Sequence, residues 1–203
     1  ELPKAIIDMQ ENDPLVSTLF VTYIGYYPKA HHHYVDRSIP ITHYVLIYCV
    51  EGCGHYRVRN HDYTVKKNQY FILPANEQHI YYSDETNPWT IYWIHFKGYK
   101  SELFSKVYGQ VISLDSENTL RIDERFKLFE DIYNVLLDSY DDSALQYANS
   151  GLAYFLASIL YVKRSGDPKT ENKYGTSLIH LATHYMNQNI GNKLKLSDIA
   201  RHF

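Results

Sequence analysis

The sequence predicts a chain of two parts, an antiparallel β sandwich or barrel followed by α-helices. Two observations in the first half indicate the β part. Thirteen of the 21 tyrosines lie between Tyr23 and Tyr99, and aromatic side chains favour pleated, half-buried surfaces. Short apolar runs also follow one another through this half, separated by turn residues and without a helical period between them. This order is typical of antiparallel strands rather than of a βαβ fold.

Six runs of strand-forming residues mark the predicted strands in chain order. The first, "YVLIYCV", ends at "EGCG", whose two glycines suit a tight hairpin. Polar turns at "NHD", "KKNQ" and "DETNP" separate the later runs. We therefore expect strands at residues 44–50, 55–59, 63–65, 70–74, 79–83 and 89–96.

The second half of the chain changes to a helical period. Apolar residues recur at helical spacing in 126–137 and again in 145–160, and "DSYDDS" between them supplies a break and an N-cap. This pattern predicts an antiparallel helical hairpin. Residues rich in glycine, proline and charge follow and indicate a linker, after which a further helix begins. The expected organisation is a barrel with an N-terminal arm at 1–115, a hairpin at 116–163, a linker at 164–175 and the start of another domain at 176–203.

The last residues, "KLKLSDIARHF", have the features of a helix start. Ser197 is a candidate N-cap, Asp198 places a negative charge in the first turn, and Ile199 and Ala200 begin an apolar stripe. No C-cap or partner helix follows, and the other end of the chain lacks an initiator methionine. We therefore expect the sequence to be cut at both ends.

Composition excludes several classes of function. A net charge of −3 and a pI near 6.4 argue against binding of a nucleic-acid backbone by these residues, because such binding needs clustered Lys and Arg. No run of about 18 apolar residues is present, so no membrane span is expected, and the N-terminus lacks the apolar region of a signal peptide. Cys49 and Cys53 are the only cysteines, and we expect reduced, structural thiols and a cytoplasmic protein.

Three stretches of the chain carry a resemblance to a known family. They are "HYVDRSIPITHYVLIYCVEGCGHYRV", "YTVKKNQYFILPANEQHIYYSDETNPWTIYWIHFKG" and, after "SLIHLATHYMNQNI", "LKLSDIARHF". Their order and spacing resemble the AraC (arabinose-regulator) family of transcription factors. The chain departs from the family pattern at "KKNQ", where a Gly-Asp turn is usual, and at "PA", where two prolines are usual.

The resemblance implies a cupin-like, double-stranded β-helix (jelly-roll) barrel that binds a small-molecule effector, a carbohydrate in the best-known case. It also implies a hairpin that forms a homodimer and a DNA-binding domain of two helix-turn-helix units. Only the beginning of that domain is present, so no residue of this sequence is expected to contact DNA specifically. The resemblance implies neither a cofactor nor a metal.

The resemblance also implies where the ligand would bind. Arg37 matches an arginine that reaches sugar hydroxyls, and Tyr81 and Trp93 match sugar-contacting positions. Because strand residues alternate between two faces, Trp93 brings Trp89, Ile91 and His95 to its own face, and His79 lies beside Tyr81 on its strand. Ile91 replaces a histidine of an arabinose-binding member, which argues against arabinose itself. The candidate ligand-binding residues are Arg37, His79, Tyr81, Trp89, Ile91, Trp93 and His95.

The same residues have simpler interpretations, which stay open here. Tryptophan and tyrosine on a strand more often fill a core, and Arg37 could pair with Asp36 on the surface. The second hairpin helix is apolar on more than one face, so it either packs on its own barrel or forms a dimer interface. We favour the dimer, through Leu152, Phe155, Leu156, Ile159 and Leu160.

Enzymatic alternatives have weaker support in the sequence. The histidine run at 31–33 is a poor chelate on an extended chain, and the other histidines lack the His-x-His order of metal cupins. No nucleophile motif, carboxylate pair or phosphate loop is present. A small metal-dependent cupin enzyme (an isomerase or dioxygenase) and a regulator whose barrel binds a partner protein remain as alternatives to a ligand-sensing regulator that is not an enzyme.

Overall fold

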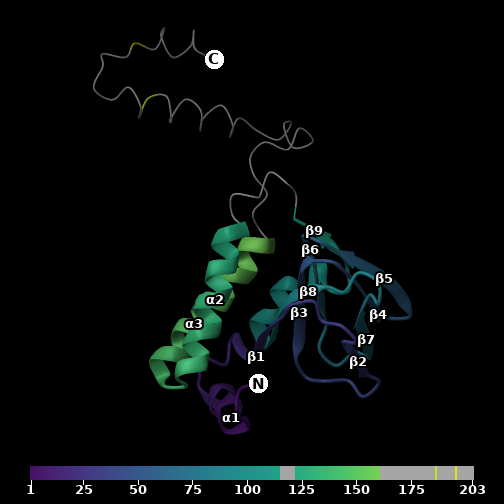
Figure 1. The fold of residues 1–203 in the computed structure, drawn as a ribbon. Helices are drawn as coiled ribbons and strands as arrows, with labels where there is room; N and C mark the ends of the chain where they lie inside the picture. Colours follow the sequence, from purple (N-terminus) through teal and green to yellow (C-terminus); the bar gives the residue numbers. More distant parts are fainter. Residues whose placement is uncertain (115–121, 161–185, 187–194, 196–203) are drawn as a thin grey trace. The chain divides into compact units, whose positions relative to one another are not determined.

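Two antiparallel sheets face each other in the computed structural model, which describes residues 1–114, 122–160 and the single positions 186 and 195. The larger sheet has the strand order β1-β8-β3-β6-β9 and the smaller one β2-β7-β4-β5 (Figure 1). Apart from the β4–β5 hairpin and the step from β8 to β9, successive strands pass from one sheet to the other, which is the expected cupin-like jelly-roll arrangement. The elements are α1 (Lys4–Asn12), β1 (Phe20–Tyr27), β2 (Tyr34–Arg37), β3 (Tyr44–Glu51), β4 (Cys53–Val58), β5 (His61–Lys66), β6 (Gln69–Leu73), β7 (His79–Ser83), β8 (Thr90–Lys97), the 3₁₀ helix η1 (Tyr99–Val107), β9 (Ile112–Ser113), α2 (Ile122–Asp138) and α3 (Asp142–Leu160).

The chain divides into two compact units, Glu1–Leu160 and Tyr161–Phe203. The barrel and the helical hairpin belong together in the first unit. The predicted linker and the predicted helix start with Ser197, Asp198, Ile199 and Ala200 lie outside the described residues. None of the helices in the described part of the chain has an apolar stretch long enough to cross a bilayer.

All six strands expected between residues 44 and 96 are present, within two residues at each end. The N-terminal segment differs from the expectation of an arm, because residues 20–27 form β1, which pairs with β8 at the edge of the larger sheet. The run "FVTYIGYY" has the aromatic and β-branched composition of a strand, so this signal was present in the sequence. Helix α1, η1 and the short β9 were not predicted.

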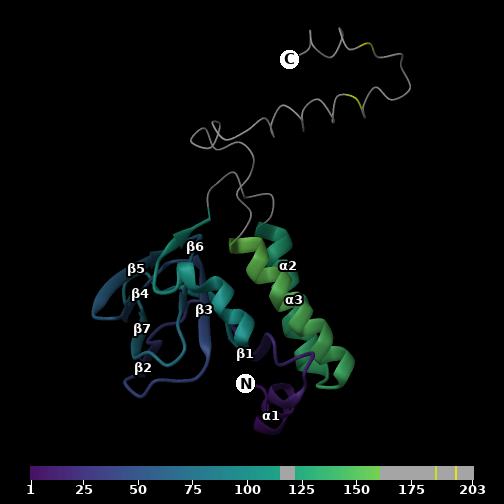
Figure 2. The same cartoon turned by 180° about the vertical axis from the view of Figure 1, so that it is seen from behind.

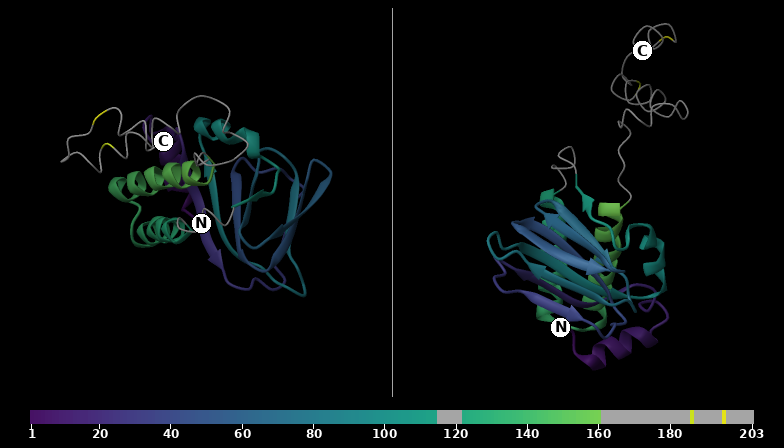
Figure 3. Two further views of the ribbon diagram at one scale, coloured as in Figure 1. Left: turned by 90° about the horizontal axis from the view of Figure 1, so that it is seen from above. Right: turned by 90° about the vertical axis from the view of Figure 1, so that its right-hand side faces the viewer.

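Helices α2 and α3 lie side by side against the outer face of the larger sheet (Figures 2 and 3). The turn between them starts α3 with a side-chain cap, because the Asp141 carboxylate accepts a hydrogen bond from the Ala144 N–H at 2.9 Å. Aromatic rings fill the contact with the sheet: the ring centroids of Tyr92 and Phe129 are 4.4 Å apart. The hairpin therefore covers the barrel's apolar outer face.

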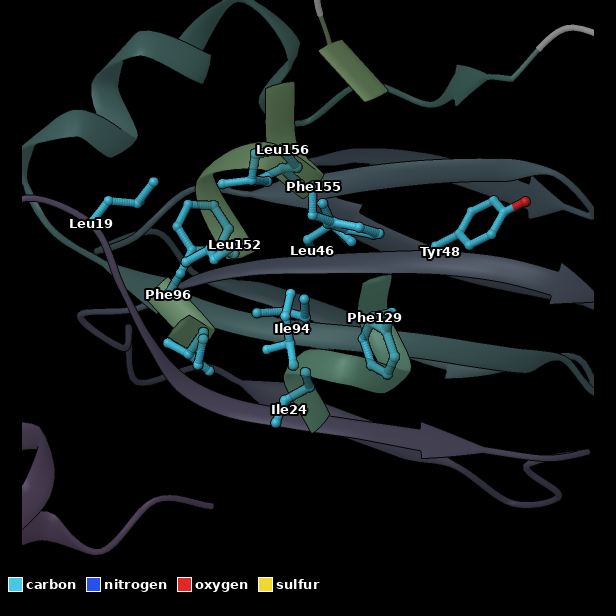
Figure 4. Packing of buried hydrophobic residues seen from close by; sticks show 14 of the residues in the cluster. Leu19, Ile24, Leu46, Tyr48, Ile94, Phe96, Phe129, Leu152, Phe155 and Leu156 are labelled. Carbon is cyan, nitrogen blue, oxygen red and sulfur yellow. The ribbon is translucent and has the colours of Figure 1, made fainter. Parts of the chain in front are cut away.

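The buried face of α3 corrects the expected dimer interface. Leu152 and Leu156 have no solvent exposure and Phe155 is 3% exposed, and all three pack with Leu46 and Ile94 of the barrel (Figure 4). Ile159 is partly buried against the same cluster, while the side chain of Leu160 lies outside the described residues. Three of the five predicted interface residues are thus core residues of their own chain, because the barrel offers the apolar surface that α3 needs.

A buried polar network joins the N-terminal helix, the barrel and the hairpin. The Asn149 side chain on α3 accepts a hydrogen bond from the Val21 N–H at 2.9 Å and donates to Gln10 Oε1 at 2.8 Å. Gln10 in turn donates to the Val21 carbonyl at 3.3 Å. Because Gln10 and Asn149 are buried, the hydrogen bond between them pairs Gln10 Oε1 and Asn149 Nδ2, and the backbone of Val21 pairs their other polar atoms.

We predict that Leu152→Ala lowers the free energy of unfolding by about 2–5 kcal/mol, because it leaves a cavity between α3 and the barrel. Leu137→Ala removes the same atoms from a leucine that is 68% exposed, and it should change the free energy of unfolding by no more than about 0.5 kcal/mol. Urea denaturation of both variants measures the difference. Equal effects of the two substitutions would contradict the placement of α3.

Candidate ligand-binding cavity

A cavity of about 240 Å³ lies inside the barrel, between the two sheets. Both sheets contribute to its wall, together with the segment that leads into β3. This volume is below the range of about 300–1,000 Å³ that is typical of pockets for drug-sized molecules, so it suits a smaller ligand. The lining residues are Tyr23, Tyr27, His33, Val35, Arg37, Ile41, His43, Ile47, Tyr81, Ile91, Trp93 and His95.

Strand β8 supplies three of the predicted site residues, Ile91, Trp93 and His95. They alternate with Tyr92, Ile94 and Phe96, which pack against the hairpin side, so the predicted division of this strand into two faces is confirmed. Ile91 has no solvent exposure and His95 is 6% exposed. The strand thus separates the cavity from the hairpin by side-chain alternation alone.

Trp93 lies against β1 because the residue opposite it is a glycine. Gly25 pairs with Trp93, and a Cβ atom at Gly25 would come within 2.4 Å of the indole ring. Any larger residue at position 25 would therefore displace the indole. Trp93 Nε1 is buried and has no hydrogen-bond partner among the described residues, so the indole presents an unused donor.

A β-bulge in β1 directs two consecutive residues to the cavity side. The register with β8 shifts between Val21 and Tyr23. Tyr23 lines the cavity, and the hydroxyl of Thr22 lies 2.7 Å from Nδ1 of His43, another lining residue. Bulges re-aim side chains in this way and occur often at functional sites.

Arg37 at the end of β2 is the one lining residue of this cavity that carries a formal charge at neutral pH. Its Nε atom is buried and finds no hydrogen-bond partner in the described part of the chain. A guanidinium is an obligatory donor in a fixed, planar fork, and none of the described residues that line the cavity is a carboxylate. The cavity therefore presents one positive charge that is not neutralised by its own wall.

The histidines of the cavity are neutral. Burial lowers the pKa of His33 and of His43. Burial, together with the charges of His43 and Arg37, lowers the pKa of His95 to about 3. Neutral imidazoles both donate and accept hydrogen bonds, so they add neutral polar groups to the wall.

Tyr81 on β7 faces Val35 on β2, and both line the cavity. Its ring lies 5.7 Å from that of His33, edge to face, and burial raises the pKa of its hydroxyl to about 12. Tyr81 is therefore a neutral donor and acceptor with an aromatic face, as the sequence predicts for a ligand-contacting position.

The structure does not place the two remaining candidates in the cavity wall. Trp89 has no solvent exposure and packs over Gly54, where a Cβ atom would lie 1.9 Å from the indole. Its Nε1 donates to His33 Nδ1 at 3.2 Å, so Trp89 positions a lining residue. His79 pairs with Arg37 across β2 and β7 and donates from Nδ1 to the Glu77 carbonyl at 3.0 Å, which leaves its buried Nε2 as an acceptor without a described partner.

Sequence reasoning missed seven lining residues, which come from β1, the histidine run, β2, the segment that leads into β3, and β3 itself. One signal was available: "FVTYIGYY" alternates as a strand, so Tyr23 and Tyr27 belong to a barrel wall. Whether the other missed residues reach the cavity depends on how the two sheets pack against each other. The missed residues are Tyr23, Tyr27, His33, Val35, Ile41, His43 and Ile47.

The histidines of the cavity do not converge on one point. The ring centroids of His43 and His95 are 6.1 Å apart, and within residues 1–114 and 122–160 no third histidine, cysteine or carboxylate joins them closely enough to form a metal-binding group. The described part of the barrel interior thus offers no ligand set of the kind that a metal cupin enzyme needs.

An internal cavity with a few polar groups between aromatic rings defines this cupin-like barrel as a ligand-binding domain. Residues 20–146 match the AraC-like ligand binding domain, and the chain belongs to this family. The resemblance found in the sequence motifs is therefore confirmed.

Curated relatives of the chain are operon regulators. The MmsAB operon regulatory protein of Pseudomonas aeruginosa is 36% identical over 101 residues, which are 48% of this chain and 33% of that protein. The Msm operon regulatory protein of Streptococcus mutans is 26% identical over 161 residues, or 66% of this chain and 54% of that protein. The chain thus matches about a third to a half of the length of these relatives.

Among solved structures, the AraC-like transcriptional activator CuxR is 14% identical with a TM-score of 0.39, covering 91% of this chain and 64% of that chain.

We predict that acidification destabilises the protein through His95. Its pKa is about 3 in the folded state against an ordinary value of 6.5, so between these values the unfolded state binds the extra proton. Stability should fall as the pH drops below about 6.5, by about 1.4 kcal/mol for each pH unit from this group alone. Thermal unfolding of His95→Gln between pH 7 and pH 4 should show a shallower decline than the parent protein.

The matched control for this prediction is His31→Gln, because His31 is exposed. This variant should keep the full decline of the parent protein. An unchanged decline in His95→Gln would show that His95 does not titrate as the structure indicates.

Proposed function

We propose that this chain is the effector-sensing portion of a transcriptional regulator and that its effector is a small hydroxylated molecule, a sugar or a sugar acid. The observation that carries the proposal is the cavity, where the buried donors Arg37 Nε and Trp93 Nε1 have no partner among the described residues and lie beside aromatic faces. Buried polar groups without partners are costly, so a ligand that accepts hydrogen bonds from them stabilises the folded state.

The chemistry of the wall supports this ligand class. A sugar ring has an apolar face that stacks on tryptophan or tyrosine, and Trp93 and Tyr81 both line the cavity. Its hydroxyl groups accept from Arg37 and exchange hydrogen bonds with the neutral imidazoles. Ile91 supplies an apolar contact at the position where an arabinose-binding member of the family has a histidine, which argues against arabinose as the ligand.

The unneutralised charge of Arg37 favours an acid over a neutral sugar. A guanidinium binds a carboxylate through two parallel hydrogen bonds, and the described part of the wall holds no carboxylate that competes for it. The proposal therefore includes uronic and other sugar acids as preferred members of the class.

Signal transmission in this proposal uses the N-terminal segment. The Tyr23 hydroxyl donates a hydrogen bond to the Glu1 carboxylate, so the first residue of the chain contacts the cavity wall. The network of Gln10, Asn149 and Val21 links the same segment to α3. A ligand that contacts Tyr23 differently in two conformations of the N-terminal segment shifts the equilibrium between those conformations. The DNA-binding domains of the dimer then change their relative orientation.

Two other functions have less support. A regulator that binds a partner protein with its barrel has no need of a polar cavity of about 240 Å³. A metal-dependent enzyme lacks a ligand set in the described barrel interior, and the curated relatives are regulators. Because operon regulators act on DNA, we place the protein in the cytoplasm.

We predict that a thermal-shift screen with mono- and oligosaccharides, uronic acids and amino sugars finds a compound that raises the melting temperature of this chain. A ligand bound only by the folded state stabilises it by mass action. Arg37→Gln should weaken binding of an acidic ligand about 10–100-fold, which corresponds to the loss of a charged hydrogen bond.

Arg57→Gln is the control for the ligand screen, because Arg57 is an exposed arginine on β4 that pairs with Asp62 at 2.6 Å. This variant should bind as tightly as the parent. A screen without any stabilising compound, or full affinity in Arg37→Gln, would contradict the proposed function.

We further propose that the homodimer uses the outer face of α3 in place of the buried leucines. Tyr147 and Tyr154 lie seven residues apart, on the same side of the helix, and are 50% and 60% exposed. Small residues at Ser150 and Ala157 lie between and beyond them, which allows a second helix to approach closely. Large exposed aromatic residues are enriched at interfaces.

We predict that the double substitution Tyr147→Glu with Tyr154→Glu converts the dimer to a monomer without loss of folded structure, because it places charges in an apolar contact. Sedimentation equilibrium and circular dichroism measure the two properties. The control Tyr99→Glu changes a tyrosine of η1 that is 70% exposed and should leave the dimer intact. A monomeric parent protein, or a dimeric double variant, would contradict this interface.

A further inference from the structure

Three potential metal ligands meet on the outer face of the smaller sheet, away from the cavity. Cys53 and His55 lie on β4, with their side chains on the face opposite the buried Tyr56. Asp84 follows β7. The Sγ atom, an imidazole nitrogen and a carboxylate oxygen of these three residues all lie within 4.8 Å of one another. We propose that this group binds a single transition-metal ion of the zinc type.

The spacing of the atoms matches a tetrahedral site. His55 Nε2 and Asp84 Oδ2 are 3.2 Å apart. Two ligands of tetrahedral Zn²⁺, each at about 2.0–2.1 Å from the ion, lie about 3.3 Å from each other. The longer Zn–S bond of about 2.3 Å places the thiolate slightly farther away. Cys53 Sγ lies within 4.8 Å of the other two atoms, so adjustment of its side chain completes three of four positions.

The carboxylate of Asp84 is already oriented for this role. Its Oδ1 accepts hydrogen bonds from the N–H groups of Thr86 and Asn87, each at 2.9 Å, and from the Thr86 hydroxyl at 2.8 Å. These bonds leave Oδ2 directed at His55. Ligating carboxylates in metal sites are held by outer hydrogen bonds in the same way.

The imidazole of His55 has a second partner that permits metal binding. Its Nδ1 lies 3.2 Å from the Thr64 hydroxyl, which is able to donate or to accept a hydrogen bond. Without metal, Nε2–H donates to Asp84 and Nδ1 accepts from Thr64. When a metal ion replaces the proton on Nε2, Nδ1–H donates to Thr64, so neither tautomer leaves an unpaired nitrogen.

The backbone around the group is fixed as well. The Cys53 N–H donates to the Asn87 carbonyl at 2.9 Å, and the Asp84 N–H donates to the Cys53 carbonyl at 3.1 Å. A metal ion therefore finds its ligands on segments that are already held together, which reduces the entropy cost of binding. His55 and Asp84 are 27% and 28% exposed and line an open hollow, so the ion has an entry path and water takes the fourth position.

The ligand set indicates the metal class. A thiolate, an imidazole and a carboxylate together suit Zn²⁺ and its tetrahedral substitute Co²⁺, while Mg²⁺ and Ca²⁺ prefer oxygen ligands alone. The sequence alone predicts no metal site here, because Asp84 is distant in the chain from the lone Cys-x-His pair of β4, Cys53 and His55.

The test is metal titration of the full chain after removal of any affinity tag, by calorimetry with Zn²⁺ and by absorption with Co²⁺. We expect one equivalent to bind, with the intense visible bands of tetrahedral Co²⁺ and a near-ultraviolet thiolate charge-transfer band. Cys53→Ser, His55→Gln and Asp84→Asn should each weaken metal binding at least about tenfold. Even the residues that hydrogen-bond to metal ligands change the metal affinity about 10–100-fold when they are replaced. Asp84→Asn keeps the Oδ1 acceptor of the turn, so it removes the ligand atom while the loop stays folded.

Two controls separate this site from other metal-binding groups. Cys49→Ala removes the other cysteine, which is buried, and should keep both the stoichiometry and the charge-transfer band. Replacing the exposed His31 by glutamine changes the histidine run outside the hollow and should also leave binding intact. The proposal is overturned by the absence of stoichiometric binding, by full affinity in the three ligand variants, or by loss of binding in the histidine-run variant alone.

Discussion

Strand β8 has both of its faces covered, and the rest of the structure depends on that constraint. The strand lies between β1 and β3 in the larger sheet. One set of alternating side chains, including Ile94 and Phe96, packs beneath the hairpin, and the other, including Trp93 and His95, lines the cavity. A slip of one residue in its pairing would exchange the two sets. The register of β8 therefore sets the ligand cavity and the hairpin contact together.

The barrel and hairpin are also joined by polar groups, which makes their contact specific. Apolar packing between α3 and the sheet is non-directional and tolerates small shifts. The hydrogen bonds of Asn149 with Val21 and Gln10 require one position of α3 and of α1 relative to β1. Val21 is two residues from Tyr23, which lines the cavity. In our proposal, the strand that contacts the ligand is thus the strand that holds both helical segments.

Much of the site on β8 could be predicted from strand alternation once the family resemblance had assigned Trp93 to the cavity. Trp93 placed Ile91 and His95 on its face, and the structure confirms this. Alternation also places Trp89 on the inner face with Ile91, but its indole packs over Gly54 within the core and does not line the cavity. Alternation from Tyr23 to Tyr27 also holds, and the bulge in β1 shifts the register only before it, between Val21 and Tyr23.

The sequence by itself determined the succession of strands from β3 to β8, the helical hairpin and the family, because these depend on local periodicity and on motifs that lie close together in the chain. Only the tertiary structure decided which apolar face of α3 is buried, since both the barrel and a second subunit offer suitable surface. It also brought Arg37 to the cavity without a counter-charge and placed Asp84 beside Cys53 and His55. Each of these depends on contacts between residues distant in sequence, whose geometry is set by how the two sheets and the hairpin pack.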